Sequence, residues 1–126
     1  MNKEAVVVDD DTKVNLVVEK ALNQLGFRVF CATEGKTALE LVKEHKPCLL
    51  ISDILIPGID GVALCGMVKN TPELQKTKVI LMTGIYKSRT FRTELDVNAD
   101  AFIEKPIDIE NLVGIVSEQI KQIDKK

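Results

Sequence analysis

The sequence predicts an α/β protein with an open, five-stranded parallel sheet that is covered by helices on both faces. Short runs of β-branched and aliphatic residues alternate five times with segments whose apolar residues recur at helical spacing. The connections between these segments are short, which favours right-handed crossovers and parallel strands. Polar residues provide a third observation, because Asp9, Asp53, Thr83 and Lys105 each stand at the end of one of these runs or within about a residue of it.

The first half of the chain contains the first three predicted strands. The β-branched run Ala5–Val8 predicts a strand, and the spacing of apolar residues over Thr12–Leu25 predicts a helix. The third strand-like run, Cys48–Ser52, is nearly all apolar, as expected for a central strand covered on both faces. The two patterns repeat as a strand at Phe27–Ala32, a helix at Lys36–Lys43 and a strand at Cys48–Ser52.

The second half continues the alternation less regularly. The segment I-L-I-P-G-I-D-G over Ile54–Gly61 predicts an ordered loop. Asp108 is expected to cap the last helix. The other predicted elements are a helix at Val62–Asn70, a strand at Val79–Met82, a weakly periodic helix at Lys87–Val97, a strand at Ala101–Glu104 and a helix at Ile109–Ile123.

Connectivity does not by itself fix the order of the strands, so we adopt 2-1-3-4-5, the order of flavodoxin-like doubly wound sheets. In that order strands 1, 3, 4 and 5 lie side by side, and ligands bind beyond their carboxyl ends. Asp9, Asp53, Thr83 and Lys105 are therefore expected at one edge of the sheet. Carboxylates, a hydroxyl and an ammonium group in one place are suited to the transfer of a phosphoryl group.

Composition narrows the class of protein. We expect residues 1–126 to form a single domain, because a chain of 126 residues with 45% hydrophobic and 29% charged residues can bury one core. The formal net charge of −2 provides no basic field for nucleic acid or an anionic membrane. The longest apolar stretches run about five or six residues, whereas a spanning helix needs about 20. The first residues lack a signal-peptide pattern, so we expect a cytoplasmic protein.

The three cysteines, Cys31, Cys48 and Cys65, are widely spaced and include no C-x-x-C pair, and the chain has one histidine. Metal binding through sulfur is therefore not expected. Each cysteine lies in an apolar context, which predicts small buried hydrophobic residues rather than reactive thiols.

Each of the four polar residues has a plainer explanation when it is considered alone. Asp9 or Asp53 could cap the segment that follows it. Thr83 could bond local backbone in a turn, and Lys105 could be a solvated charge. Capping explains one aspartate at a time, however, and gives no reason for an ammonium and a hydroxyl at the neighbouring strand ends.

With these motifs the chain resembles the receiver domain of bacterial two-component response regulators, the CheY-like family. The resemblance extends from Lys3 to about Ile123. It is carried by the pair Asp9-Asp10 after the first strand, Asp53 with its loop P-G-I-D-G, Thr83-Gly84 after the fourth strand and Lys105-Pro106 after the fifth.

The resemblance implies that Asp53 accepts a phosphoryl group from a sensor histidine kinase or phosphotransfer protein in a Mg²⁺-dependent reaction. Asp10 and Asp53 would bind Mg²⁺ directly, Asp9 directly or through water, and the backbone carbonyl of Leu55 would complete the protein ligands. Mg²⁺ suits oxygen ligands and would relieve the repulsion between the carboxylates. Lys105 and Thr83 would stabilise charge on the transferred group. The protein would not be an enzyme beyond phosphorylating and dephosphorylating itself.

The resemblance also implies a conformational switch. Thr83 would move toward the phosphoryl group, Phe102 would turn inward, and the peptide bond before Pro106 would be cis. The helix after Thr83, the fifth strand and the last helix would dock an effector, a fused output domain or a second copy of the chain. Plainer explanations are a fixed core ring for Phe102 and a solvated helix face for the basic residues Lys87, Arg89 and Arg92.

Two further positions bear on the lifetime of the phosphoryl group. Leu55 and Ile85 lie two residues beyond Asp53 and Thr83, at positions that resemble the family's modulators of this lifetime. Neither side chain can hydrogen-bond a hydrolytic water, so we predict slower autodephosphorylation than in a variant that carries Leu55→Asn and Ile85→Glu.

Other functions on such a fold are less well matched. A haloacid-dehalogenase-type phosphatase needs a second Asp two residues after the first, where this chain has Leu55. Flavin or dinucleotide binding would need a glycine-bearing phosphate loop after the first strand, where V-D-D-D-T-K has none. The remaining alternative is a receiver-like protein-interaction module that does not accept phosphate.

Overall fold

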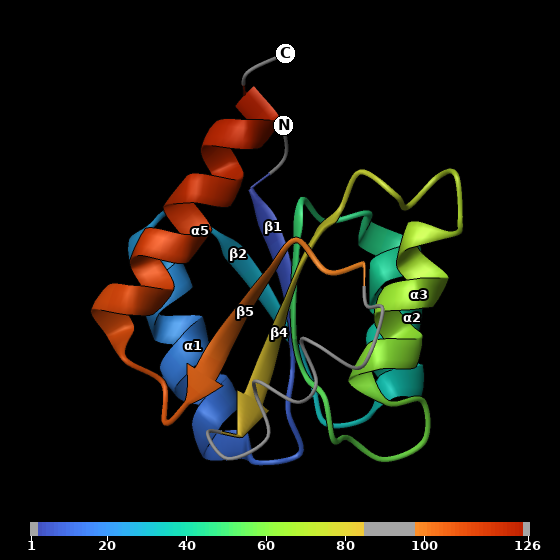
Figure 1. Ribbon diagram of the computed structural model, residues 1–126, viewed down its shortest axis with the longest axis horizontal. Coiled ribbons are helices and arrows are strands. Elements are labelled where there is room, and N and C mark those ends of the chain that lie inside the picture. Colours follow the sequence, from blue (N-terminus) through green and yellow to red (C-terminus); the bar gives the residue numbers. More distant parts are fainter. Residues whose placement is uncertain (1–2, 85–97, 125–126) are drawn as a thin grey trace.

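The structure is a computed structural model that describes residues 3–84 and 98–124 of the chain. Its centre is a parallel sheet with the strand order β2-β1-β3-β4-β5, which confirms the predicted fold class (Figure 1). Every predicted strand is present, and its ends lie within about two residues of the predicted ones. The strands are β1 (Glu4–Val8), β2 (Arg28–Ala32), β3 (Leu49–Asp53), β4 (Lys78–Gly84) and β5 (Ala101–Lys105).

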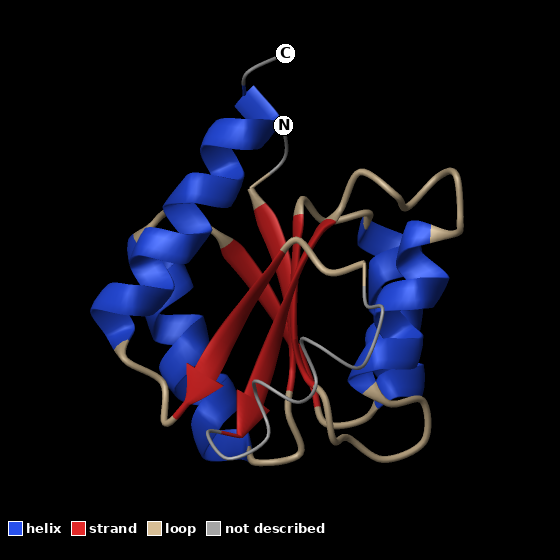
Figure 2. Ribbon diagram, viewed as in Figure 1, coloured by secondary structure: helices blue, strands red, loops and turns tan. Residues whose placement is uncertain are grey.

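The helices cover both faces of the sheet, as predicted. Figure 2 shows α1 and α5 on one face and α2 and α3 on the other. None of the described helices is long and apolar enough to cross a membrane. The helix predicted over Lys87–Val97 lies outside the described residues. The helices that the structure describes are α1 (Thr12–Gln24), α2 (Gly35–His45), α3 (Gly61–Lys69) and α5 (Ile109–Asp124).

Alternate side chains of each strand enter two separate cores. On β1, Ala5 and Val7 belong to the core beneath α1 and α5, whereas Val6 and Val8 belong to the core beneath α2 and α3. All four have no exposed surface. Because both faces are covered, the central strands are apolar without interruption, and only their ends are free to carry polar side chains.

The helix caps are residues other than the two aspartates that sequence analysis considered. Asp11 caps α1, and its side chain accepts a hydrogen bond from the backbone N–H two residues later at 2.9 Å. Asp60 caps α3, and its Oδ1 accepts from the backbone N–H three residues later at 2.8 Å. Capping of a helix therefore does not explain Asp9 or Asp53.

Two other helix ends differ in how well the sequence predicts them, namely the start of α5 and the end of α2. Asp108 caps α5 as predicted, because its Oδ1 accepts a hydrogen bond from the backbone N–H of Glu110 at 3.0 Å. Helix α2 runs two residues past its predicted end, to His45, and its C-cap residue Lys46 has a φ of 45°. A left-handed lysine is uncommon in this position, where glycine or asparagine is usual, so the stop signal in the sequence is Pro47, two residues beyond the helix, rather than the cap residue.

The cysteines differ in exposure, which corrects the prediction that all three are buried. Cys65 is buried and Cys48 is half-buried, but Cys31 is exposed. Cys31 lies on the edge strand β2, and its Sγ lies 3.8 Å from Oε1 of Glu19 on α1. Partial burial and the charge of Glu19 raise the pKa of the Cys31 thiol to about 11. The thiol therefore stays protonated near neutral pH despite its exposure.

Candidate functional site

The carboxyl ends of the strands lie at one edge of the sheet, the lower edge in Figure 2. Asp9 directly follows β1, and Asp53 and Lys105 are the last residues of β3 and β5. Thr83 is the penultimate residue of β4. Because β1, β3, β4 and β5 are consecutive in the sheet, these four polar residues lie at neighbouring strand ends.

Three carboxylates form a tight group at this edge, which we call the acidic cluster: Asp9, Asp10 and Asp53. One carboxylate oxygen from each of them lies within 4.8 Å of the other two. The sheet brings them together, because Val8 pairs with Ser52 in the register of β1 and β3 and the aspartates come next. Asp9 is fully buried, Asp53 is half-buried and Asp10 is exposed.

The ammonium group of Lys105 contacts two members of the acidic cluster. Its Nζ lies 2.6 Å from Oδ2 of Asp9 and 3.3 Å from Oδ2 of Asp53. Oδ2 of Asp9 accepts no well-aligned hydrogen bond from a described residue, so the Lys105 ammonium is the group that compensates this buried charge. Among residues 3–84 and 98–124, a single ammonium faces three carboxylates, which leaves the described part of the site with an excess of negative charge.

This crowding shifts the pKa values of the groups involved. Burial raises the pKa of the Asp53 carboxyl above its usual value, the charge of Asp9 adds to the increase, and Lys105 opposes it. Burial alone would lower the pKa of Lys105, but its contacts with Asp9 and Asp53 outweigh burial and raise it. Lys105 is therefore firmly cationic at neutral pH, while the residues that the structure describes carry too little positive charge to balance the carboxylates.

The hydroxyl of Thr83 lies within this edge of the sheet and is unpaired among the described residues. The residue is 1% exposed, and its Oγ1 has no hydrogen-bond partner among residues 3–84 and 98–124. The plainer explanation, a turn hydroxyl that bonds local backbone, is therefore wrong for the described part of the chain. A buried polar group without a partner costs about 1–3 kcal/mol of stability. Such groups are found at sites where a bound ligand or ion supplies the missing partner.

The loop after Asp53 is held close to it by Gly61, a residue whose role sequence analysis missed. A Cβ atom on Gly61 would lie 2.3 Å from the backbone oxygen of Asp53, and its N–H donates to the carbonyl of Ile54 at 2.8 Å. Only glycine lets α3 begin this close to the end of β3. The D-G pair in the loop was the available signal, but a sequence does not reveal which backbone atom a glycine approaches.

The other predicted site residues have varied surroundings. Leu55 is 59% exposed in the loop after Asp53. Phe102 is partly buried on β5 and packs against the core beneath α2 and α3. The Lys105–Pro106 peptide bond is cis, as the resemblance implies. The residues that lie outside the described part of the chain are Ile85, Lys87, Arg89 and Arg92.

The acidic cluster fits the requirements of Mg²⁺. Mg²⁺ binds oxygen at about 2.0–2.1 Å, so two ligands of one ion are at most about 4.2 Å apart. Carboxylate oxygens that lie within 4.8 Å of one another are close to this spacing, and a bridging water extends their reach. All three donors are hard oxygen atoms, and no sulfur or imidazole belongs to the cluster.

The comparisons with known proteins agree with this arrangement. Residues 5–117 match the response regulator receiver domain family. The signal receiver domain of a signal transduction histidine kinase from Syntrophus aciditrophicus is 29% identical over 98% of this chain and 94% of that one, with a TM-score of 0.89. A protein assigned as a response regulator, from Chloroflexus aurantiacus J-10-fl, is 28% identical over 96% of this chain and 99% of that one, with a TM-score of 0.87.

A third solved structure, NtrX from Brucella abortus, belongs to a much longer chain. It is 27% identical with a TM-score of 0.84, and the alignment covers 98% of this chain but only 28% of the NtrX chain. The family match spans most of the sequence, and the strand order and acidic cluster are those expected from the motifs. This chain is a member of the response regulator receiver domain family.

Proposed function

We propose that this receiver domain accepts a phosphoryl group on Asp53 in a Mg²⁺-dependent reaction and thereby acts as a signalling switch. The observation that carries the proposal is the acidic cluster with Lys105 Nζ 2.6 Å from Asp9 and 3.3 Å from Asp53. Like charges so close together destabilise a fold. If this edge of the sheet served only the stability of the fold, fewer carboxylates would be more favourable. The excess of negative charge in the acidic cluster therefore favours a role in binding a cation and a phosphoryl group.

The chemistry assigned to Asp53 is nucleophilic. A carboxylate oxygen of Asp53 attacks the phosphorus atom of a phosphohistidine or a small acyl phosphate, and a P–O bond to the aspartate forms. The P–N or P–O bond to the donor breaks, and the leaving group takes the electron pair. The product is an aspartyl phosphate.

The metal site of the proposal is formed by the acidic cluster and the loop after it. Asp10 and Asp53 would hold Mg²⁺ directly, Asp9 directly or through water, and Leu55 would contribute its backbone carbonyl. The bound ion would supply the positive charge that the cluster lacks and neutralise the phosphoryl oxygens.

Two residues are proposed to bind the phosphoryl group. Lys105 is cationic and already lies 3.3 Å from Asp53, so its ammonium can stabilise charge on a group attached there. The Thr83 hydroxyl is buried and has no partner in the described part of the chain, so it is available to donate to a phosphoryl oxygen. Movement of Thr83, followed by an inward turn of Phe102, would convert phosphorylation into a change of surface.

The proposed partners follow from this role. A sensor histidine kinase or phosphotransfer protein in the cytoplasm would donate the phosphoryl group. The changed surface would dock an effector, a fused output domain or a second copy of the chain, with Lys87, Arg89 and Arg92 as its candidate contacts. The NtrX chain extends well beyond the part that matches this chain, and this supports a fused output domain as one of the proposed partners.

The proposal is tested by incubating the protein with Mg²⁺ and acetyl phosphate and measuring its intact mass. We expect one added phosphoryl group in the wild type and in Asp60→Asn, a control that loses the same charge from a helix cap. We expect none in Asp53→Asn. Absence of an adduct in the wild type would favour the alternative, an interaction module that does not accept phosphate.

A further inference from the structure

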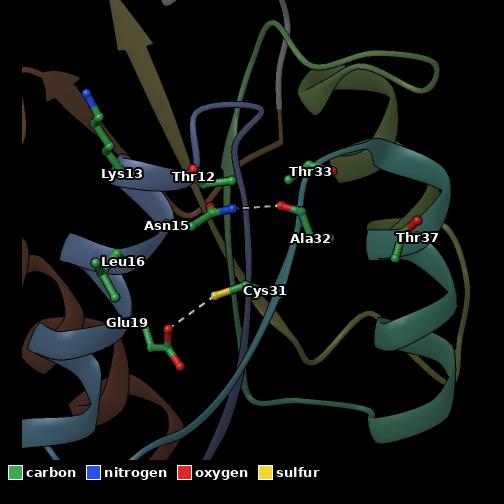
Figure 3. Close-up of a pocket in the computed structure, with 9 residues that line it drawn as sticks. All are labelled: Thr12, Lys13, Asn15, Leu16, Glu19, Cys31, Ala32, Thr33 and Thr37. Atoms are coloured by element: carbon green, nitrogen blue, oxygen red, sulfur yellow. Dashed lines mark hydrogen bonds between the residues drawn. The ribbon is translucent and has the colours of Figure 1, made fainter.

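Asn15 is a buried polar residue of α1 that the proposed chemistry does not use. It is 5% exposed, and its Nδ2 donates hydrogen bonds to the backbone carbonyls of Asp9 and Ala32, each at 3.0 Å. Figure 3 shows the bond to Ala32 reaching from α1 to the end of β2. Both partners are acceptors, so the amide must present its nitrogen to them. One side chain therefore ties together the carboxyl ends of two neighbouring strands.

The bond to Asp9 gives its carbonyl a donor that the neighbouring strands do not supply. The paired register of β1 ends at Val8, opposite Ala32 on one side and Ser52 on the other. The carbonyl of Asp9 lies beyond both ladders, inside a fully buried residue. A buried carbonyl needs a donor, and the Asn15 amide supplies it.

Contacts from four different residues consequently fix the polar atoms of Asp9. Its backbone N–H donates to the carbonyl of Ala32 at 3.2 Å, and its carbonyl accepts from Asn15. Its Oδ1 accepts from the backbone N–H of Asp11 at 2.9 Å, and its Oδ2 lies 2.6 Å from Lys105. Among these four residues, Asn15 contacts Asp9 with a side chain that comes from within helix α1, and Asn15 is not itself part of the candidate site.

We infer that Asn15 is a positioning residue, which holds the Asp9 backbone so that its carboxylate stays within the acidic cluster. The inference rests on the proposed function where it concerns Mg²⁺. Groups that orient metal ligands in this way typically contribute about 10- to 100-fold to metal affinity. Removing the amide frees the Asp9 carbonyl, lets the peptide rotate and lowers the fraction of time in which the three carboxylates are close together.

The surroundings of Asn15 make a substitution feasible. The residue lines a cavity of about 530 Å³ between α1, β2 and α2, together with Glu19 and Cys31 (Figure 3). Its Oδ1 has no hydrogen-bond partner among the described residues. Leucine at this position removes both donated bonds, and the adjacent cavity offers it room. Serine is a milder change, because it keeps a single hydroxyl donor on a shorter side chain.

The test compares Asn15→Leu, Asn15→Ser and a control, Val18→Ala, which removes buried methyl groups from the same helix without removing a bond to Asp9. Hydrogen exchange of the Asp9 and Asp11 amides, followed by NMR, reports whether Asp9 is held in place. Isothermal titration with MgCl₂ reports the metal affinity, and thermal melting reports stability.

We expect Asn15→Leu to accelerate exchange at both amides and to weaken Mg²⁺ binding by about tenfold or more, with a smaller effect in Asn15→Ser. Val18→Ala should lower the melting temperature and leave both site measurements near the wild type. Unchanged exchange at Asp9, or equal changes in Val18→Ala, would overturn the inference. If Asn15→Leu does not fold, Asn15→Ser decides by the same criteria. A wild type that takes no phosphoryl group defeats the proposed function, whereas the exchange data still decide whether Asn15 holds Asp9.

Discussion

The ammonium of Lys105 lies 2.6 Å from a carboxylate oxygen of Asp9, a residue with no exposed surface. This contact joins the end of β5 to the end of β1, although β3 and β4 lie between them in the sheet. Lys105 therefore reaches across the carboxyl edge of the sheet, and the same ammonium serves the stability of the free protein and the proposed reaction.

Lys105→Met should destabilise the protein, because it leaves the buried Asp9 carboxylate without its cation. We expect the free energy of unfolding to fall by about 2–3 kcal/mol, toward the low end for a broken buried pair because the Lys105 side chain keeps 25% exposure. Urea unfolding at neutral pH measures the loss. Lys78→Met is the matched control, since its side chain is 22% exposed and its partner Asp100 keeps Lys69 at 2.7 Å. Equal losses in the two variants would contradict the role given to Lys105.

Asp53→Asn should stabilise the Mg²⁺-free protein, because it removes one of three crowded carboxylates. We expect the free energy of unfolding at pH 7 to rise by about 1–2 kcal/mol. Asp60→Asn is the control, because it removes the same charge from a helix cap where asparagine serves equally well. A comparable gain in the control would mean that net charge alone, rather than the acidic cluster, sets the effect.

The gain from Asp53→Asn should depend on pH in a defined direction. Burial and the neighbouring Asp9 raise the pKa of Asp53 in the folded protein above its usual value of 3.8. A raised pKa means that ionisation opposes folding, so the wild type loses stability as pH rises from about 3.8 through the raised value. The difference between variant and wild type should therefore be small near pH 3.5 and grow toward neutrality. Unfolding curves across this range test the sign.

Gly35→Ala and Gly66→Ala should change stability in opposite directions. A Cβ on Gly35 would lie 1.9 Å from the backbone oxygen of Ile59, so α2 would have to move off the loop that follows Asp53. We expect a loss of about 2 kcal/mol or more. A Cβ on Gly66 in α3 meets nothing within 4 Å, and alanine favours helix, so a gain of about 0.5–1 kcal/mol is expected. Thermal unfolding of both variants compares the two, and a stabilised Gly35→Ala would refute the close packing.

The aspartyl phosphate should decay more slowly in the wild type than in the double variant Leu55→Asn, Ile85→Glu. The exposed Leu55 offers no hydrogen bond to an attacking water, whereas asparagine and glutamate side chains do. Loss of the phosphoryl group, followed by intact mass after removal of the donor, measures the rates. Equal or faster decay in the wild type would remove this explanation.

The fold was largely predictable because the central strands β1, β3 and β4 are covered on both faces. Such strands are continuous apolar runs, and the polar residue that ends each run marks the carboxyl edge of the sheet. The 2-1-3-4-5 order came from a general rule for doubly wound sheets, and the structure confirms it. The end of α2 was less predictable, since Lys46 adopts a left-handed conformation that its residue type rarely indicates.

The members of the candidate site could be identified from strand ends, but their contacts could not. Sequence places Lys105 near the aspartates without showing that it pairs most closely with Asp9. Asn15 had no signal, because its partners are backbone carbonyls that the chain brings together only in three dimensions. The exposure of Cys31 was also hidden, since it depends on the gap between α1 and the edge strand.

Asp53 is the residue that we propose takes the phosphoryl group. Treatment with Mg²⁺ and acetyl phosphate, followed by borohydride, reduces an aspartyl phosphate to homoserine, and peptide mass spectrometry locates the product. We predict homoserine at position 53 alone, and only when Mg²⁺ is present. Homoserine at Asp9 or Asp10, or none at position 53, would contradict the assignment of Asp53 as the phosphoacceptor.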